Sequence, residues 1–238
     1  MSKIRIAPRF ILVGLLFALT GCTSFMQDHT PDEWLSLSVA GLASTDRYAF
    51  SGQTTVSTAE GWTFTPLNFN GKVVDHEQLA AKADDGSTLE WSPVELLQQI
   101  KKNDKQVSFS PISSGSTDTN SVILQINMND ATSSEIWKTR LTEEMNQLAD
   151  NAPLSEGSLK QEWMKEWNQS RQELSDMLKK LKVTTQYELV IDRKTLVPRK
   201  LNEQSVFVYT KGNQQREEKR ITNMSFDSFD GRASNTVQ

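Results

Sequence analysis

The fold of this chain is decided by the stretch YELVIDRKTLVP, residues 187–198. Its first half places Tyr187, Leu189 and Ile191 at every second position, which is the period of a strand with one buried face. Residues 192–195, Asp-Arg-Lys-Thr, are typical of a turn, so the chain is expected to reverse there and to extend again. The stretch therefore predicts a strand, a tight turn and a second strand.

The same pattern continues on both sides of this stretch. Downstream, the chain extends to Tyr209, turns at Lys211-Gly212-Asn213 and extends again over residues 215–229. Strands joined by such short turns pair antiparallel, so the C-terminal part is predicted to be a meander. Upstream strands are expected over residues 47–56, 62–65, 67–73, 79–83, 107–109 and 121–129. Residues 79–83 also contain good helix formers, but we favour a hairpin with residues 67–73.

Helix-capping patterns in the sequence predict where helices begin between these strands. Thr30-Pro31-Asp32-Glu33 and Ser92-Pro93-Val94-Glu95 each combine a capping box with an early proline, and predict helices that end near Ala43 and Lys102. Two further boxes, Thr132 to Glu135 and Ser158 to Gln161, predict two longer helices within residues 131–181. Apolar residues recur at helical spacing in both, so together they are expected to form an αα-hairpin.

These elements predict an α+β fold. A curved antiparallel sheet, an unclosed half-barrel, is expected to be covered on its concave face by helices that include the αα-hairpin. Tryptophan and methionine concentrate in that hairpin, and such side chains suit either an apolar binding surface or an ordinary core. The candidate ligand-binding residues are Trp137, Leu141, Met145, Trp163, Met164, Trp167, Leu174, Leu178, Tyr187, Leu189 and Ile191.

The N-terminus has the form of a secretory signal. Three basic residues precede an apolar run over residues 10–19, which ends in Leu19-Thr20-Gly21-Cys22. As a helix this run would be only about 15 Å long, too short to span a hydrocarbon core of about 30 Å. Its last four residues resemble the lipobox of bacterial lipoproteins, in which the cysteine is diacylglycerylated and becomes the first mature residue. The alternative is an ordinary buried or unpaired cysteine.

The resemblance to lipoproteins implies a location in the cell and a division of the chain into segments. Residues 1–21 would be the signal peptide, 22–29 a lipidated tether, 30–230 a single domain with the hairpin 131–181 inserted, and 231–238 a flexible tail. The lipid on Cys22 would hold the protein at the extracytoplasmic face of a membrane. Ser24, rather than aspartate, follows two residues after the cysteine, which favours the outer membrane in a Gram-negative cell.

Two short stretches resemble the LolA/LolB/LppX-like superfamily of lipoprotein carriers. They are Tyr48-Ala49-Phe50-Ser51-Gly52 and the stretch 187–198, which is similar to a strand, Asp-x-x-Thr turn and Leu-x-Pro segment of that family. The order of elements is similar over roughly residues 30–230. The resemblance implies an unclosed barrel that holds acyl chains or acylated proteins beneath helices. The longer hairpin of this chain departs from the family pattern.

Composition narrows the classes of function. Loss of residues 1–21 removes three positive charges and no negative ones, which moves the net charge from −4 to about −7 and argues against nucleic acid as a partner. Two histidines and one cysteine leave no metal-ligand spacing and no internal disulfide. No catalytic motif is found, and paired acids such as Glu143 and Glu144 are neighbours that point apart.

We therefore expect a non-catalytic lipoprotein without a cofactor. The first hypothesis is reversible binding of a lipid, acyl chain or other hydrophobic ligand between the sheet and the helices. The alternative is a scaffold with a filled core, which binds an envelope protein partner through its exposed surface. An envelope hydrolase is the least favoured hypothesis.

Overall fold

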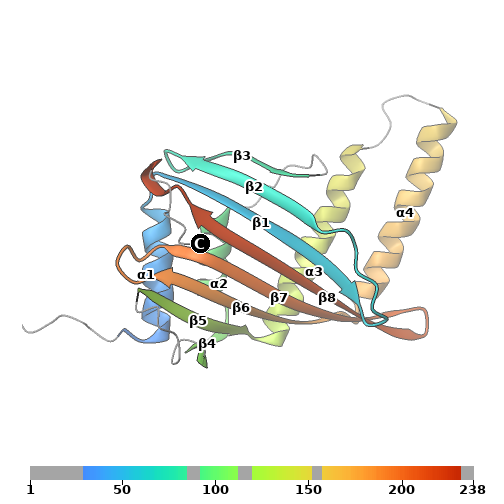
Figure 1. Cartoon of the computed structure of the whole chain (residues 1–238). Helices are drawn as coiled ribbons and strands as arrows, with labels where there is room; N and C mark the ends of the chain where they lie inside the picture. The colour runs from blue at the N-terminus through green and yellow to red at the C-terminus, as the bar shows by residue number, and fades with distance from the viewer. Residues whose placement is uncertain (1–28, 85–91, 112–119, 152–156, 232–238) are drawn as a thin grey trace, which may run out of the picture. The chain divides into compact units, whose positions relative to one another are not determined.

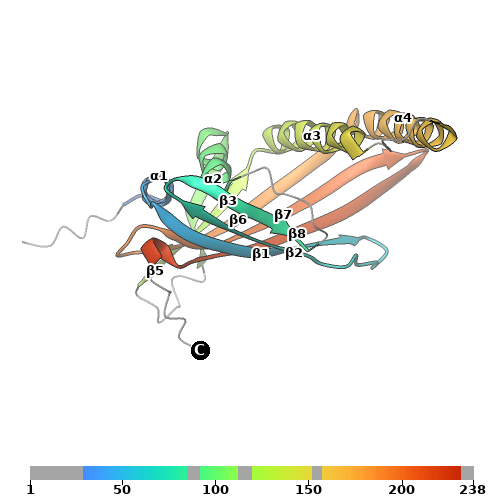
Figure 2. The ribbon, with the colours of Figure 1, turned by 90° about the horizontal axis from the view of Figure 1, so that it is seen from above.

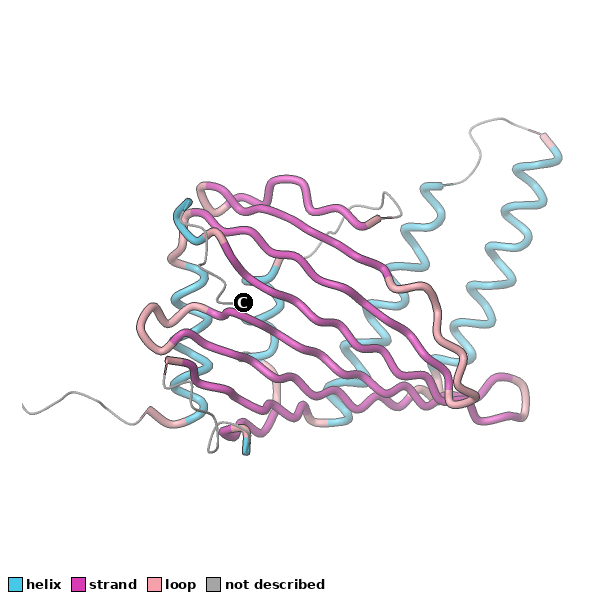
Figure 3. Tube along the Cα trace, viewed as in Figure 1, coloured by secondary structure: helices cyan, strands magenta, loops and turns pink. Residues whose placement is uncertain are grey.

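The computed structural model describes residues 29–84, 92–111, 120–151 and 157–231, and Pro31–Gln238 form one compact unit. The strands of this unit are drawn as arrows in Figure 1 and in magenta, joined by pink turns, in Figure 3. The helices are α1 Pro31–Ala43, α2 Pro93–Lys102, α3 Asp130–Gln147 and α4 Ser158–Leu178. The strands are β1 Arg47–Thr58, β2 Leu67–Val74, β3 Glu77–Ala83, β4 Lys105–Phe109, β5 Ser121–Met128, β6 Lys182–Asp192, β7 Pro198–Lys211 and β8 Gln214–Asp227.

All eight strands form one antiparallel sheet with the order β3-β2-β1-β8-β7-β6-β5-β4. The sheet is open, with β3 and β4 at its edges. The predicted C-terminal meander, β6-β7-β8, is confirmed and lies in the middle of the sheet, where β8 pairs with β1. The predicted hairpin of β2 and β3 is also confirmed, and residues 62–65 contribute only an isolated bridge between Ser57 and Thr63.

The sequence signals for helix starts succeeded at α2 and failed at the hairpin. Ser92 caps α2, and its side chain and that of Glu95 form the predicted capping box. The box predicted from Thr132 is wrong, because Asn129 caps α3 through hydrogen bonds from the N–H groups of Ala131 and Thr132. The box predicted from Ser158 is wrong as well, since Ser158 is already helical and follows Gly157, which makes no side-chain cap. At the start of α3, asparagine is among the best capping residues, so Asn129 caps the helix one turn before the box predicted from Thr132.

The inner face of the sheet, defined here as the face that the helices cover, carries the core. Figure 2 shows α1 and α2 over one half of the sheet, and α3 and α4 toward the end where β7 and β8 join. The main apolar cluster joins Leu35 and Leu42 of α1, Leu97 of α2 and strand residues such as Leu124 and Leu189, each no more than 1% exposed. Strand residues at every second position enter this cluster, as the alternation predicted.

Two glycines let aromatic rings lie flat across the first hairpin. Phe50 pairs with Gly71, and Gly52 pairs with Phe69 in the same register. A Cβ on Gly71 would lie 2.4 Å from Cζ of Phe50, and one on Gly52 would lie 2.4 Å from Cζ of Phe69. Each ring therefore occupies the space above the opposite glycine, which explains two glycines within strands.

The turn between β6 and β7 is built around Asp192. Its carboxylate accepts hydrogen bonds from the N–H groups of Lys194 and Thr195 and from Arg199. Burial raises the pKa of Asp192, but the hydrogen bonds from Thr195 and Arg199 outweigh burial and leave the pKa below its ordinary value. The Asp-x-x-Thr pattern seen in the sequence is thus a turn whose backbone donors are satisfied by the first side chain.

Candidate functional site

The predicted lipidation site lies outside the described residues. Cys22, the signal peptide 1–21, residues 22–28 of the predicted tether 22–29 and residues 232–238 of the predicted tail 231–238 all fall there. Within the described residues, no helix combines the length and the hydropathy needed to cross a membrane. The prediction of an anchored protein therefore stays a prediction.

The predicted ligand-binding residues fall in three places. Tyr187, Leu189 and Ile191 of β6 belong to the main core cluster, and they are 9%, 0% and 0% exposed. Side chains of α1 and α2 pack in the same cluster. These three residues are therefore integral to the packed core.

Trp137 forms the centre of a second, smaller cluster that fixes α3 to the sheet. It is 3% exposed and packs with Leu181, Val183 and Phe207, and its ring meets that of Phe207 edge-on at 4.8 Å. Leu141 and Leu178 pack on this cluster from α3 and α4. Trp137 thus acts as the anchor of the hairpin on β6 and β7.

Of the remaining candidates, Met145, Trp163 and Trp167 line a seam between α3 and α4. Leu174 is half-buried on α4, and Met164 is exposed. The indole N–H of Trp167 donates to the main-chain oxygen of Met145 at 3.2 Å, and the rings of Trp163 and Trp167 are nearly parallel at 6.2 Å. No residue of α4 is buried, so its apolar residues are at best half-buried. A helix that carries an apolar stripe normally buries it against another element. The seam is therefore only partly closed.

The far end of the hairpin exposes apolar side chains. Leu148 lies in the short 3-10 helix that follows α3, and Leu159 and Met164 lie on the two flanks of the apolar stripe of α4. They are 49%, 62% and 37% exposed, and we call these three residues the hairpin patch. Met164 also lines an open hollow of about 630 Å³. It is lined by Gly157, Lys160, Gln161, Met164, Lys165 and Asn168. The hollow is on the surface of α4 and is not a space between the sheet and the helices.

Two neighbouring rows of polar side chains lie between the two apolar clusters, and the sequence analysis did not predict them. The strand pairing aligns two rows across the inner face, which together we call the polar belt. Its members are Tyr187, Glu203, Thr222 and Thr54 in one row, and Thr185, Ser205 and Arg220 in the next. No sequence signal marks the belt, because each strand contributes only one or two members and the pairing register brings them together.

Hydrogen bonds link the belt to the hairpin anchor. The indole N–H of Trp137 donates to Thr185, whose hydroxyl is 2.9 Å from that of Ser205. Ser205 in turn donates to the Glu203 carboxylate at 3.0 Å. The side-chain oxygen of Ser134 accepts a bond from the N–H of Val183, which gives α3 a second polar contact with β6. The belt therefore fixes where α3 lies along the sheet.

The belt also holds buried charge. The guanidinium carbons of Arg140 and Arg220 lie 4.8 and 5.0 Å from the centre of the Trp137 ring. Burial lowers the pKa of Arg220, and the nearby Arg140 lowers it further, whereas Glu203 opposes the shift. Burial also raises the pKa of Tyr187 well above its usual range, and Glu203 adds to that shift. Because burial raises the pKa of Tyr187, its phenol stays protonated near neutral pH.

Comparisons with known proteins identify no family for this chain. No protein-family model matches it, and no curated protein matches it. Among the described residues, no group of histidine, cysteine, aspartate and glutamate side chains is arranged to hold a metal ion.

Proposed function

We propose that this protein is a non-catalytic lipoprotein of the cell envelope, anchored through Cys22, that binds an envelope protein through the α3–α4 hairpin. The fold would be that of the LolA/LolB/LppX-like superfamily, with the helix-covered face as the concave side of an unclosed half-barrel. The resemblance of residues 48–52 and 187–198 supports this part of the proposal.

One contrast supports a protein partner over a ligand held against the sheet. The inner face is filled by α1 and α2, and Leu42, Leu97, Leu124 and Leu189 are all 0% exposed there. In contrast, α4 has an apolar stripe and no buried residue. Helix-to-helix recognition uses such stripes at three- and four-residue spacing. A partner that covers the seam and the hairpin patch would complete the burial that the described residues leave unfinished.

Site-specific photo-crosslinking in cells tests this proposal. A benzoylphenylalanine placed at Leu159, in the hairpin patch, should trap one envelope protein as a discrete adduct identified by mass spectrometry. Gln172 is the matched control, because it is an exposed residue on the opposite side of α4. The adduct at position 159 should disappear when Met164→Glu is added. No adduct at position 159, or equal adducts at both positions, would contradict the proposal.

A second candidate function is binding of a lipid or acyl chain along the same hairpin. The parallel Trp163 and Trp167 rings and the open hollow beside Met164 favour it. Broad aromatic rings and flexible methionine are the side chains that apolar ligands contact most easily. A fluorescent fatty acid should then bind the purified protein, and Trp163→Asp should abolish binding with the fold retained. In the crosslinking experiment, an adduct with the mass of a lipid would favour this candidate.

A further inference from the structure

The end of the sheet where β7 and β8 join exposes the most conspicuous aromatic residues of the described chain. Trp62 and Phe64, in the loop between β1 and β2, are 75% and 57% exposed. They lie far from the hairpin patch in the sequence and play no part in the core clusters. Adjacent large apolar side chains with this exposure mark an interaction surface more often than a packing accident.

The loop that presents these rings is held in a defined conformation. The N–H of Thr58 donates to the carbonyl oxygen of Trp62 at 2.8 Å, and the N–H of Phe64 donates to that of Val56 at 2.9 Å. The same loop is tied to β8 by an ion pair between Glu60 and Arg216 at 2.6 Å. The aromatic side chains therefore project from an ordered frame, so little conformational entropy would be lost when they become buried.

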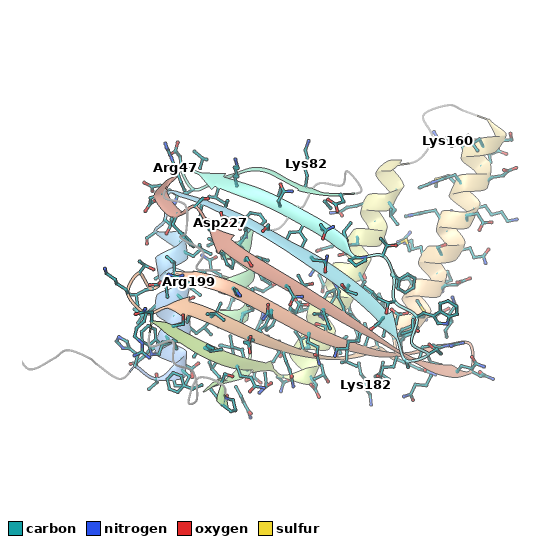
Figure 4. All side chains as sticks on the ribbon, viewed as in Figure 1. Arg47, Lys82, Lys160, Lys182, Arg199 and Asp227 are labelled. Carbon is teal, nitrogen blue, oxygen red and sulfur yellow. The ribbon has the colours of Figure 1, made fainter. Side chains whose placement is uncertain are left out.

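Three lysines without an ion pair among the described residues lie at the same end of the sheet. Lys182 opens β6, and Lys211 closes β7 at its turn with β8. Lys180 follows the end of α4, two residues before Lys182. These three lysines are exposed, and none has an ion pair among the described residues. Figure 4 shows Lys182 at the end of the sheet near the turn of β7 and β8.

The acidic side chains at this end are mostly engaged. Glu60 pairs with Arg216, Asp176 pairs with Lys179 at 2.6 Å, and Glu218 accepts a hydrogen bond from Tyr209. Glu217 of β8 is exposed here without an ion pair among the described residues, so three lysines face one free carboxylate at this end, although the chain as a whole carries a net charge of −4. We call Trp62, Phe64, Lys180, Lys182 and Lys211 the basic aromatic end.

We propose that the basic aromatic end docks on the surface of an anionic lipid bilayer. Tryptophan and phenylalanine bury well at the level of lipid headgroups, and lysines reach the headgroup phosphates with extended side chains. Anionic lipids attract juxtamembrane lysines in a salt-dependent way. The three lysines favour an anionic lipid surface over an apolar protein groove, because such a groove offers no negative charge to pair with them. The inference is independent of the hairpin and of the partner proposed for it.

Vesicle flotation tests the inference. The protein for the assay is the chain from residue 22 onward carrying Cys22→Ser, because Pro31–Gln238 form a compact unit with its own core. It should float with vesicles of phosphatidylglycerol and phosphatidylcholine, and less with phosphatidylcholine alone. The double variant Trp62→Ser/Phe64→Ser should lower the partition coefficient by at least about tenfold, since it removes most of the apolar surface that would enter the bilayer.

A triple variant measures the contribution of lysine charge to vesicle binding, and a matched control measures non-specific binding through exposed apolar residues elsewhere. Changing Lys180, Lys182 and Lys211 to glutamine should weaken binding to anionic vesicles and flatten its dependence on salt. The control Leu159→Ser/Met164→Ser removes apolar surface from the hairpin patch and should leave flotation unchanged. All of these side chains are exposed, so the circular dichroism melting curves should coincide.

Three outcomes would overturn the inference. They are failure of the unaltered protein to float with anionic vesicles at low salt, retention of flotation by the double aromatic variant, and loss of flotation in the hairpin control. A benzoylphenylalanine at position 62 that traps one protein and no lipid in cells would likewise overturn it and would indicate a protein partner at this end. None of these results bears on the adduct expected at Leu159.

Discussion

The unequal burial of two tryptophans in one hairpin leads to a prediction with a worked magnitude. Trp137 of α3 is 3% exposed, packs on Val183 and Phe207, and donates a hydrogen bond to Thr185. Trp163 of α4 is only half-buried, in a helix with no buried residue. Replacing each by alanine makes the same chemical change at two sites that differ in packing.

The expected losses of stability differ several-fold. Truncating a fully buried tryptophan costs about 3–5 kcal/mol, because the transfer free energy is lost and a cavity remains. At Trp137 the lost contact with two guanidinium groups adds to that cost. Trp163→Ala should cost about 1 kcal/mol, since its site is open and water can fill it. In a domain of this size, about 1 kcal/mol corresponds to a shift of about 2–4 °C in Tm.

Urea unfolding measures the free energy of unfolding of each variant and thermal melting measures its Tm, both followed by circular dichroism. Trp137→Ala should lower Tm by about 10 °C and reduce the unfolding free energy by at least about 3 kcal/mol. Trp137→Phe should recover part of the loss, because an aromatic ring still packs against Phe207, while the hydrogen bond to Thr185 and part of the filled volume are missing. Equal losses for the two alanine variants would refute the assignment of Trp137 as the anchor of the hairpin.

Two further predictions concern the sheet. Gly52→Ala and Gly71→Ala should each lower the free energy of unfolding by about 1–3 kcal/mol in the same urea assay, because the new methyl group meets Phe69 and the main-chain oxygen of Asn223 in one case and Phe50 in the other. Adding Phe50→Leu to Gly71→Ala should restore part of the loss, and no restoration would contradict the steric cause. The second prediction concerns Asp192, whose pKa in the folded protein lies below its ordinary value of 3.8. The ionised carboxylate therefore stabilises the folded state above pH 3.8. This stabilisation is lost as the pH falls through the pKa of the folded state. Asp192→Asn should therefore remove part of the acid dependence of Tm below about pH 4, and an unchanged profile would contradict this role.

Local patterns predicted the strands and most helix bounds well. The alternation of Val122, Leu124 and Ile126 marks one buried face of β5, and all three residues are buried as expected. The capping box at Ser92 predicted the start of α2. Such features depend on neighbours within a few residues, so the sequence contains their full cause.

The hairpin shows why candidate sites are harder to predict than elements. Trp137, Trp163 and Tyr187 all satisfy an apolar periodicity, yet one anchors a helix, one lines a half-open seam and one lies in the main core. Periodicity states which side chains share a face of their own element. It does not state which other element covers that face.

The sequence by itself determined the two-residue alternation of the strands, the short turns that make them antiparallel, and the helical spacing of the hairpin. Only the tertiary structure decided that α1 and α2 fill the inner face, that α4 keeps its stripe unburied, and that Glu203 and Arg220 enter one polar belt. The physical reason is the distance along the chain between the residues that make each contact. Turns and caps are set by contacts between near neighbours, whereas burial depends on strand register and helix placement, which join residues far apart in the chain.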